Sequence, residues 1–272
     1  MNPKAEFYLP ADAKRGPVKY LCVSAHADDT EIMAFHGIKT SLEREDTEFN
    51  AVIVTDGAGS SRTGKYKNVT DADMVRLRNA EQKAVAEKAH YAGVWFLNYE
   101  SRHERMRELI DDLKEIIIKI SPKVIYTHNI CDSHRTHIMT VSALIAALKE
   151  LKDVYCPESL FGMETWRDLD WLPEKNKLLF DVSCSNGLDA ELLSMFESQT
   201  AGGKRYDLAA VARREANATF SASHAVDNFT KISYGMDLLP LVKEEIPMSL
   251  YAVRLIDAFA NEVIHNVKEF EK

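Results

Sequence analysis

The sequence lacks the features by which membrane, secreted and nucleic-acid-binding proteins are recognised. No apolar run approaches the roughly 20 residues that a membrane helix needs, so no membrane partner is expected. The N-terminal segment contains no apolar core of a secretory leader, and we therefore expect a cytoplasmic protein. The chain of 272 residues has 34 Lys and Arg against 42 Asp and Glu, which gives a net charge of −8. This acidic balance argues against a nucleic-acid partner.

Two kinds of short motif are also missing. The four cysteines are far apart and form neither a C-x-x-C pair nor a zinc-finger spacing. We expect them to be reduced thiols, with the buried ones packing as small apolar groups. No G-x-G-x-x-G motif is present after the first apolar run, so the glycine-rich loop that binds dinucleotides is absent.

Hydrophobic periodicity predicts alternating strands and helices over the first 150 residues. Short apolar runs rich in β-branched residues predict strands, and apolar residues spaced three and four apart predict helices. Strands that alternate with helices form βαβ units around a parallel sheet. The expected fold class is α/β, a Rossmann-like, doubly wound, mainly parallel sheet with helices on both faces. The predicted strands are residues 18–25, 49–55, 94–99 and 124–128, and the predicted helices are 31–45, 70–90, 106–120 and 135–151.

The second half of the chain is less regular, but nothing marks a domain boundary. Residues 152–177 hold prolines and scattered aromatics and are expected to form an irregular excursion over the sheet. No linker rich in Pro, Gly or Ser and no internal repeat divides the chain. We therefore expect a single domain over residues 1–272, with a regular core at 1–150 and a part at 151–272 that completes the pocket. Further elements are predicted as a strand at 177–183 and helices at 187–200, 205–219 and 249–270.

Two polar clusters follow two of the predicted strands. His26, Asp28 and Asp29 come directly after the first strand, and His134 and His137 lie a few residues beyond the fourth. In a doubly wound sheet with strand order 3-2-1-4, the first and fourth strands are neighbours and flank the switch point where ligands bind. The predicted fold therefore brings both clusters into one crevice.

The residue types in these clusters suit a catalytic metal. His26, Asp29 and His137 form a set of two imidazoles and one carboxylate, which leaves coordination positions open. A metal in such a site lowers the pKa of a bound water toward about 7. Asp28 is placed to take the proton of that water, and His134 to assist at a substrate oxygen or leaving group. The set suits zinc and also ferrous iron.

Each cluster alone has a simpler interpretation. A histidine at a strand end is usually a hydrogen-bonded surface residue, and an Asp-Asp pair before a helix is usually a cap. The arrival of both clusters at neighbouring strand ends makes the metal site the preferred hypothesis.

The same residues carry a resemblance to a known family. Residues 26–32, HADDTEI, resemble the H-P/A-D-D-x-E-I signature of the LmbE-like (PIG-L) zinc N-deacetylases, and residues 132–137, DSHRTH, resemble that family's D-x-H-P-D-H motif. Residues 55–57 and 78–84 match its intermediate segments, so the similarity covers about residues 18–145. The departures, Ala in the first motif and Arg-Thr between the histidines of the second, remove no ligand and leave the substrate open.

The resemblance implies a zinc-dependent N-deacetylase acting on an N-acetyl amino sugar or its conjugate. In the family, the metal is held by the positions that match His26, Asp29 and His137. The position that matches Asp28 serves as general base and then acid, and that of His134 assists at the tetrahedral intermediate.

Other residues have two interpretations each. Arg62 lies in the loop where the family commonly has a substrate-binding arginine, and a solvated loop arginine is the alternative. Asp132 either orients a histidine by accepting a hydrogen bond from its ring or forms a turn. Arg78 and Glu81 are expected to form a structural pair. Trp166 is expected to anchor the irregular segment rather than to stack on a sugar.

Two other functions stay open at this point. An amidase acting on another sugar or thiol conjugate at the same metal site is the close alternative. A Rossmann-like ligand-binding protein without catalysis belongs to a different class and lacks its glycine motif. The oligomeric state is also open, with a homo-oligomer among the alternatives.

Overall fold

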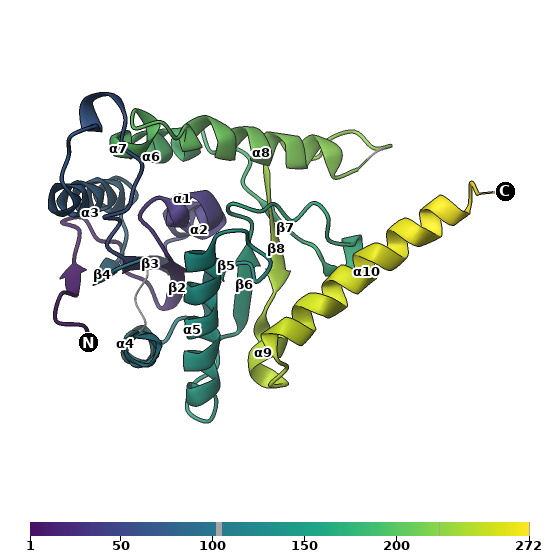
Figure 1. The fold of residues 1–272 in the computed structure, drawn as a ribbon, viewed down its shortest axis with the longest axis horizontal. Coiled ribbons are helices and arrows are strands. Elements are labelled where there is room, and N and C mark those ends of the chain that lie inside the picture. The colour runs from purple at the N-terminus through teal and green to yellow at the C-terminus, as the bar shows by residue number, and fades with distance from the viewer. Residues whose placement is uncertain (102–104, 223, 272) are drawn as a thin grey trace.

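The computed structural model describes residues 1–101, 105–222 and 224–271, which build an eight-stranded sheet (Figure 1). The strand order is β1-β4-β3-β2-β5-β6-β8-β7. Strands β2 to β6 are parallel, whereas β1, β8 and β7 join the sheet in antiparallel pairs. The predicted α/β class with a mainly parallel sheet is confirmed. The strands are β1 Glu6–Tyr8, β2 Val18–Ser24, β3 Thr47–Thr55, β4 Gly93–Tyr99, β5 Val124–His128, β6 Ser159–Met163, β7 Leu178–Asp181 and β8 Ile232–Asp237.

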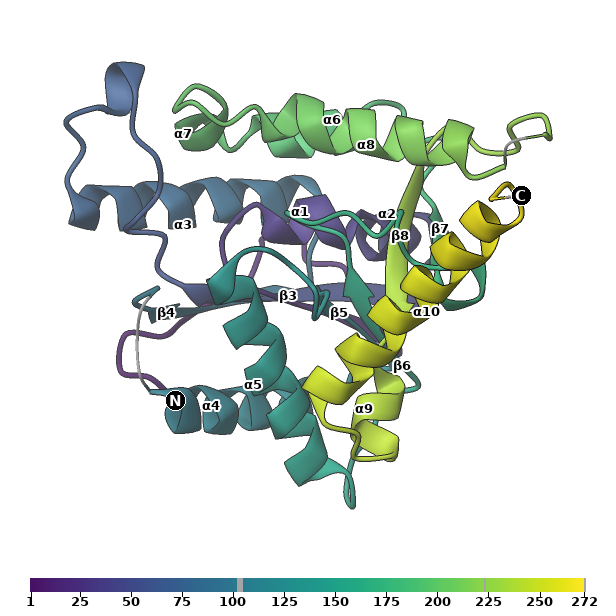
Figure 2. The same ribbon diagram turned by 45° about the vertical axis from the view of Figure 1, so that its right-hand side comes forward.

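Helices cover both faces of the sheet, as Figure 2 shows with α1 to α3 above it and α4 and α5 below. One apolar core lies between the sheet and α4, α5, α9 and α10, and a second lies under α1, α2, α3 and α6. Within the described ranges, no helix combines the length and the apolar character needed to span a membrane. The helices are α1 Asp29–Met33, α2 Phe35–Glu43, α3 Asp71–Lys88, α4 Met106–Ile120, α5 Arg135–Leu151, α6 Leu188–Ser194, α7 Glu197–Thr200, α8 Tyr206–Phe220, α9 Leu239–Lys243 and α10 Met248–Lys268, with short 3-10 turns at Gly64–Tyr66 and Glu174–Asn176.

The predicted strand order is confirmed where it matters for the site. The four strands expected as 3-2-1-4 are β4, β3, β2 and β5, in that order. Strand β2 lies between β3 and β5, and its Val23 pairs with Thr127 of β5 in parallel register. The carboxyl ends of β2 and β5 are therefore adjacent.

The sequence-based elements differ from the structure in two ways. The helix predicted at 31–45 is split at Ala34 into α1 and α2, and the one predicted at 187–200 is split into α6 and α7. Strands β1, β6 and β8 were not predicted. Both β6 and β8 contain a glycine where a Cβ atom would lie 2.8 Å from a neighbouring side chain, Leu238 beside Gly162 and Met163 beside Gly235. Glycine weakens a strand pattern in the sequence, yet here it permits close packing.

A buried carboxyl group follows β6 and ties the C-terminal part to the sheet. Glu164 Oε1 accepts hydrogen bonds from Asn217 Nδ2 at 2.7 Å and from the Tyr234 backbone N–H at 3.0 Å. Burial raises the pKa of Glu164 to about 7, although its hydrogen-bond donors favour the ionised form. Glu164 therefore holds its proton more tightly in the folded chain than in the unfolded one.

We expect Glu164 to make the fold less stable as the pH rises between about 4.5 and 7. A carboxyl group whose pKa is higher in the folded state contributes stability below its unfolded pKa, and this contribution is lost as the pH rises through the folded value. Glu164→Gln keeps an accepting oxygen and removes the titration. Urea unfolding of both proteins across this pH range should show the wild type losing stability relative to the variant. A difference that does not change with pH would contradict the assignment.

Candidate metal centre and active site

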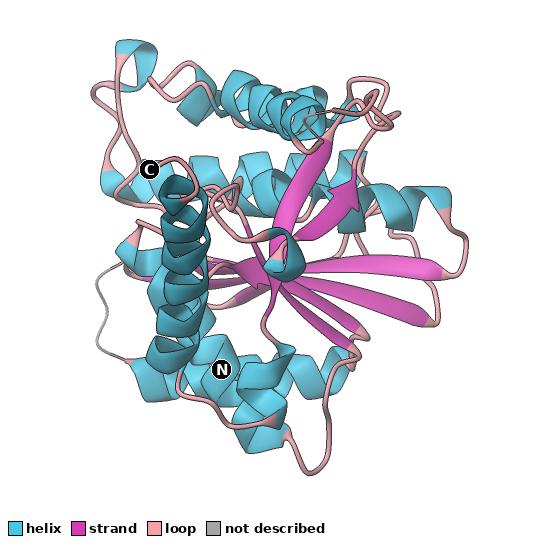
Figure 3. Cartoon of the chain, turned by 90° about the vertical axis from the view of Figure 1, so that its right-hand side faces the viewer, coloured by secondary structure: helices cyan, strands magenta, loops and turns pink. Residues whose placement is uncertain are grey.

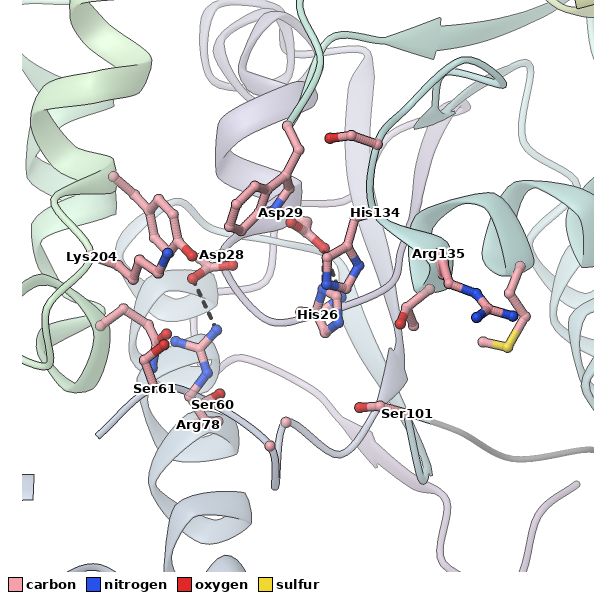
Figure 4. Close-up of a pocket in the computed structure, with 18 residues that line it drawn as sticks. His26, Asp28, Asp29, Ser60, Ser61, Arg78, Ser101, His134, Arg135 and Lys204 are labelled. Carbon is pink, nitrogen blue, oxygen red and sulfur yellow. Dashed lines mark hydrogen bonds and ion pairs between the residues drawn. The ribbon is translucent and has the colours of Figure 1, made fainter. Parts of the chain in front are cut away.

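The two polar clusters meet at the adjacent ends of β2 and β5 (Figure 4). His26 follows β2, Asp29 begins α1, and His137 lies in the first turn of α5. His26 Nδ1 is 2.9 Å from Asp29 Oδ2. His137 Nε2 is 3.3 Å from Asp29 Oδ2 and 3.3 Å from His26 Nδ1. Three ligand atoms from two distant parts of the chain thus converge on one point.

These three atoms are spaced as the ligands of one metal ion are. In a tetrahedral zinc site with bonds of about 2.0–2.1 Å, neighbouring ligand atoms lie about 3.3 Å apart. Burial opposes the ionisation of Asp29, yet His137 and His26 hold its pKa well below the usual value. Burial also opposes the protonation of His137, but Asp29 and Asp132 outweigh it and raise its pKa to about 9. The set therefore attracts positive charge, and its residues fit a divalent metal.

His128 also lies next to this set, but one of its ring nitrogens is already occupied by a hydrogen bond. The His128 ring stacks on His137, with 3.8 Å between centroids, and its Nε2 is 3.6 Å from Asp29 Oδ2. That nitrogen accepts a hydrogen bond from the Ala25 backbone N–H at 2.9 Å, and Nδ1 lies 3.3 Å from Thr165 Oγ1. Burial lowers the pKa of His128 well below its usual value, so the ring is neutral. Because its lone pair is already occupied, we exclude His128 from the candidate ligand set.

Asp28 is held beside the set with an unusual backbone. Its φ of 82° is left-handed, a conformation that costs a non-glycine residue roughly 1–3 kcal/mol and persists where the surroundings enforce it. Gln82 Oε1 accepts the Asp28 backbone N–H at 3.2 Å, and Arg78 donates to the Ala27 carbonyl. Arg78 Nη2 also donates to Asp28 Oδ2 at 2.9 Å, the dashed contact in Figure 4. Burial raises the pKa of Asp28 to about 6, against the pull of Arg78.

His134 and Asp132 belong to the loop that begins α5. The His134 ring lies 5.0 Å from that of His26 and 4.6 Å from that of His137. Its Nδ1 is buried without a hydrogen-bond partner among the described residues, and burial lowers its pKa. Asp132 accepts the backbone N–H groups of His134 at 2.9 Å and Trp166 at 3.1 Å. Asp132 Oδ2 lies 3.4 Å from His137 Nδ1, which places it to orient that ring.

A cavity of about 1,090 Å³ opens over these residues. His26, Asp28, Asp29 and His134 lie at its centre, with Lys204 on one side and Arg135 on the other (Figure 4). The wall on the side of Lys204 is aromatic. Trp166, Tyr206 and Lys204 line that wall. The ring centroid of Trp166 lies 5.7 Å from that of His134, on which it stacks, and 6.3 Å from that of Tyr206. Lys204 Nζ lies 5.0 Å from the Trp166 ring centroid.

Among the predicted site residues, Arg62, His137 and Asp132 do not line the cavity, and of these Arg62 also makes no contact with the candidate ligands in the structure. Its neighbours Ser60 and Ser61 line the cavity, but the Arg62 guanidinium donates to the Ala58 carbonyl and pairs with Asp71 Oδ1 at 2.7 Å.

Two residues that line the cavity were assigned other roles from the sequence. Arg78 was expected to form a structural pair with Glu81, and its Nη1 does lie 3.7 Å from Glu81 Oε2. Arg78 is also 2% exposed, lines the cavity and contacts Asp28, which the sequence did not indicate. Trp166 was expected to anchor an irregular segment, but it is 44% exposed and lines the cavity. Trp166 follows β6, which lies next to β5 in the sheet. Its position near the site could have been predicted only if β6 had been recognised as a strand.

Comparison with known proteins agrees with this geometry. Residues 21–148, which contain both clusters, match the model of the PIG-L family, described as GlcNAc-PI de-N-acetylase. Residues 21–148 are thus similar to the PIG-L family. The predicted resemblance is thereby confirmed over the part of the chain that builds the candidate metal centre. None of the curated proteins matches the chain.

Several solved structures share the fold of this chain at low sequence identity. GalB, the 4-carboxy-2-hydroxymuconate hydratase from Pseudomonas putida, is 18% identical with a TM-score of 0.65, over 85% of this chain and all of that one. N,N'-diacetylchitobiose deacetylase from Pyrococcus horikoshii is 17% identical with a TM-score of 0.66, and the match covers 82% of this chain and 84% of that one. The A40926 pseudoaglycone deacetylase Dbv21 is 15% identical with a TM-score of 0.60, and the match covers 80% of this chain and 96% of that one. At these identities the likeness shows the fold alone, and the reaction must be argued from the site.

Proposed function

We propose that this protein is a metal-dependent hydrolase that removes the acetyl group from an N-acetyl amino sugar or its conjugate. The observation that carries the proposal is the convergence of His26 Nδ1, Asp29 Oδ2 and His137 Nε2 within 3.3 Å of one another, in a PIG-L segment and beneath a large cavity. Zinc is the metal we favour, and ferrous iron suits the same ligands. When bound in such a set, a metal supplies Lewis-acid polarisation and a lowered pKa for water.

The proton transfers are assigned to the residues beside the ligands. Asp28 faces the cavity, and a carboxyl group with a pKa of about 6 is mainly ionised at pH 7 and can still return a proton. It takes a proton from the attacking water and delivers it to the amide nitrogen as the C–N bond breaks, so that acetate and a free amine are formed. Arg78 holds the Asp28 carboxylate in place. His134 faces the same cavity and is assigned to the developing charge on the carbonyl oxygen.

The shape of the cavity supports an amino sugar or, better, a conjugate of one. Its volume of about 1,090 Å³ is slightly above the range of roughly 300–1,000 Å³ for small-molecule sites. The flat rings of Trp166 and Tyr206 offer an apolar surface to the faces of a sugar ring. Residues beyond 150 supply this wall, which supports a single domain whose C-terminal part completes the pocket. A cytoplasmic location is part of the same proposal.

Trp166→Ala is expected to raise KM for such a substrate about five- to tenfold and to leave kcat and metal content nearly unchanged. The ring contributes to binding before and during the reaction, whereas its backbone N–H, which holds Asp132, is kept. Trp171→Ala is the matched control, because that ring packs against Phe259 outside the cavity lining. Steady-state kinetics of the two variants should separate them. Equal KM values would remove Trp166 from the substrate site.

The proposed function is tested by incubating metal-loaded protein with N-acetyl amino sugars, their glycosides and other N-acyl conjugates. Release of free amine and acetate in equal amounts, lost in Asp28→Asn, is the expected result. Release of amine from other N-acyl conjugates alone would favour the alternative function, an amidase that acts on another conjugate at the same metal site. If no N-acyl compound yields an amine while the protein carries its metal, the hydrolase proposal is wrong.

A further inference from the structure

The last helix exposes an apolar face that the described part of the chain leaves largely uncovered, although the ring of Phe259 lies 6.1 Å from that of Trp171. Helix α10 is 21 residues long, about 30 Å, and Leu255 is its one fully buried residue. Figure 1 shows it at the edge of the molecule, with its C-terminal half extending away from the sheet, and Figure 3, turned by 90°, shows it from outside, in front of the rest of the chain. The exposed apolar residues on and just after it are Leu250, Val253, Ile256, Phe259, Val263, Ile264, Val267 and Phe270.

These residues form a continuous stripe rather than scattered positions. Their spacing of three and four residues places them on one side of the helix. Their exposed fractions range from 37% for Phe259 to 85% for Phe270. At roughly 60–120 Å² for a fully exposed side chain, the stripe presents on the order of 250–500 Å² of apolar surface, which is comparable to the functional patches of monomers.

We propose that this face binds the same face of a second copy of the chain, as an antiparallel pair of α10 helices about a two-fold axis. The upper end of the apolar area agrees with this partner. A standard interface contributes about 800 Å² per subunit, of which some 60% is apolar, or about 500 Å². A single self-complementary face also closes into a dimer about a two-fold axis.

The charges along the helix favour this pairing. An axis between Glu262 and Val263 places Asp257 of one copy opposite Lys268 of the other, and the symmetry forms this contact twice. A membrane surface is the less suitable partner, because interfacial helices carry Lys and Arg on their polar side. The polar side of α10 mixes Asp257 and Glu262 with Arg254 and Lys268, and the whole chain has a net charge of −8.

Sedimentation equilibrium of the full chain tests the pairing. The wild type is expected to be a dimer at micromolar concentration, and Val263→Glu to raise the dimer dissociation constant at least about tenfold. Val154→Glu is the matched control, since that valine is 77% exposed at the turn after α5, away from the stripe. Circular dichroism checks that both variants fold. A monomeric wild type, or a dimer unaffected by Val263→Glu, would overturn the proposal.

A charge exchange tests the register. Asp257→Lys and Lys268→Asp should each weaken the dimer, and the double variant should restore it, because each exchanged charge again meets its opposite. A double variant no more dimeric than the single ones would overturn the antiparallel arrangement. Phosphatidylcholine–phosphatidylserine vesicles provide the competing outcome. If the wild type stays monomeric and binds them, and Val263→Glu does not, the face is a membrane contact and the dimer is wrong.

Discussion

Asp28→Asn is expected to lower kcat/KM by a factor of about 10²–10⁴ without changing the metal content. Asparagine keeps the size of the side chain and an oxygen that can accept the Arg78 hydrogen bond, which is 2.9 Å long in the wild type. It cannot accept a proton from water at neutral pH. The backbone contact with Gln82 is independent of the side chain, so the turn should be preserved. Kinetics on an active substrate and elemental analysis of the purified variant are the measurements.

Asp29→Asn is the control for this prediction, because the two aspartates are adjacent but face different groups. Asp29 Oδ2 lies 2.9 Å from His26 Nδ1 and 3.3 Å from His137 Nε2, whereas Asp28 Oδ2 is paired with Arg78. Asp29→Asn should therefore lower metal content and activity together. If Asp28→Asn lost the metal and Asp29→Asn kept it, the two roles would have to be exchanged.

The sequence was sufficient to predict the arrangement of the four parallel strands β2 to β5, because the information that defines each of them is local. Each strand of the β4-β3-β2-β5 order is a short apolar run, and the connecting helices carry their own periodicity. The topology of βαβ units then places the ends of β2 and β5 side by side. His26, Asp29 and His137 could be brought together on paper because each lies within ten residues of one of those two strand ends.

Residues that reach the cavity from other elements could not be predicted in this way. Arg78 is in the middle of α3, and its contact with Asp28 spans 50 residues of sequence. An R-x-x-E spacing on a helix is also typical of a surface ion pair, so the pattern does not distinguish the two. Trp166 depends on β6, a five-residue strand with a glycine. In both cases the long-range packing, rather than the local pattern, decides where the side chain points.

The exposed face of α10 is another feature that the local sequence pattern could not predict in full. A helix was predicted over residues 249–270, and its apolar residues, among them Val253, Ile256 and Val263, recur at helical spacing. Periodicity of this kind says that a face needs a partner, but not whether the partner is in the same chain. The structure leaves that face exposed, and this is why the interface had to be inferred from the fold.

His137→Ala is expected to reduce the metal content from close to one divalent ion per chain to nearly none, and to abolish hydrolysis. Its Nε2 lies 3.3 Å from both other ligand atoms, and two remaining ligands hold a catalytic metal poorly. His137 is fully buried, so the folded state of the variant is checked by circular dichroism. His26→Ala, at a more exposed position, provides a second ligand deletion if the first variant does not fold.

His128→Gln is the matched control for the metal prediction. This buried histidine lies 3.6 Å from Asp29 Oδ2 and stacks on His137, so its atoms also fall within reach of a shared ion. Its Nε2 already accepts the Ala25 N–H, and the glutamine oxygen can take over that role. We therefore expect His128→Gln to retain its metal. If it loses the ion as completely as His137→Ala does while staying folded, the ion is held by Asp29, His128 and His137, and His26 is a residue of the cavity wall.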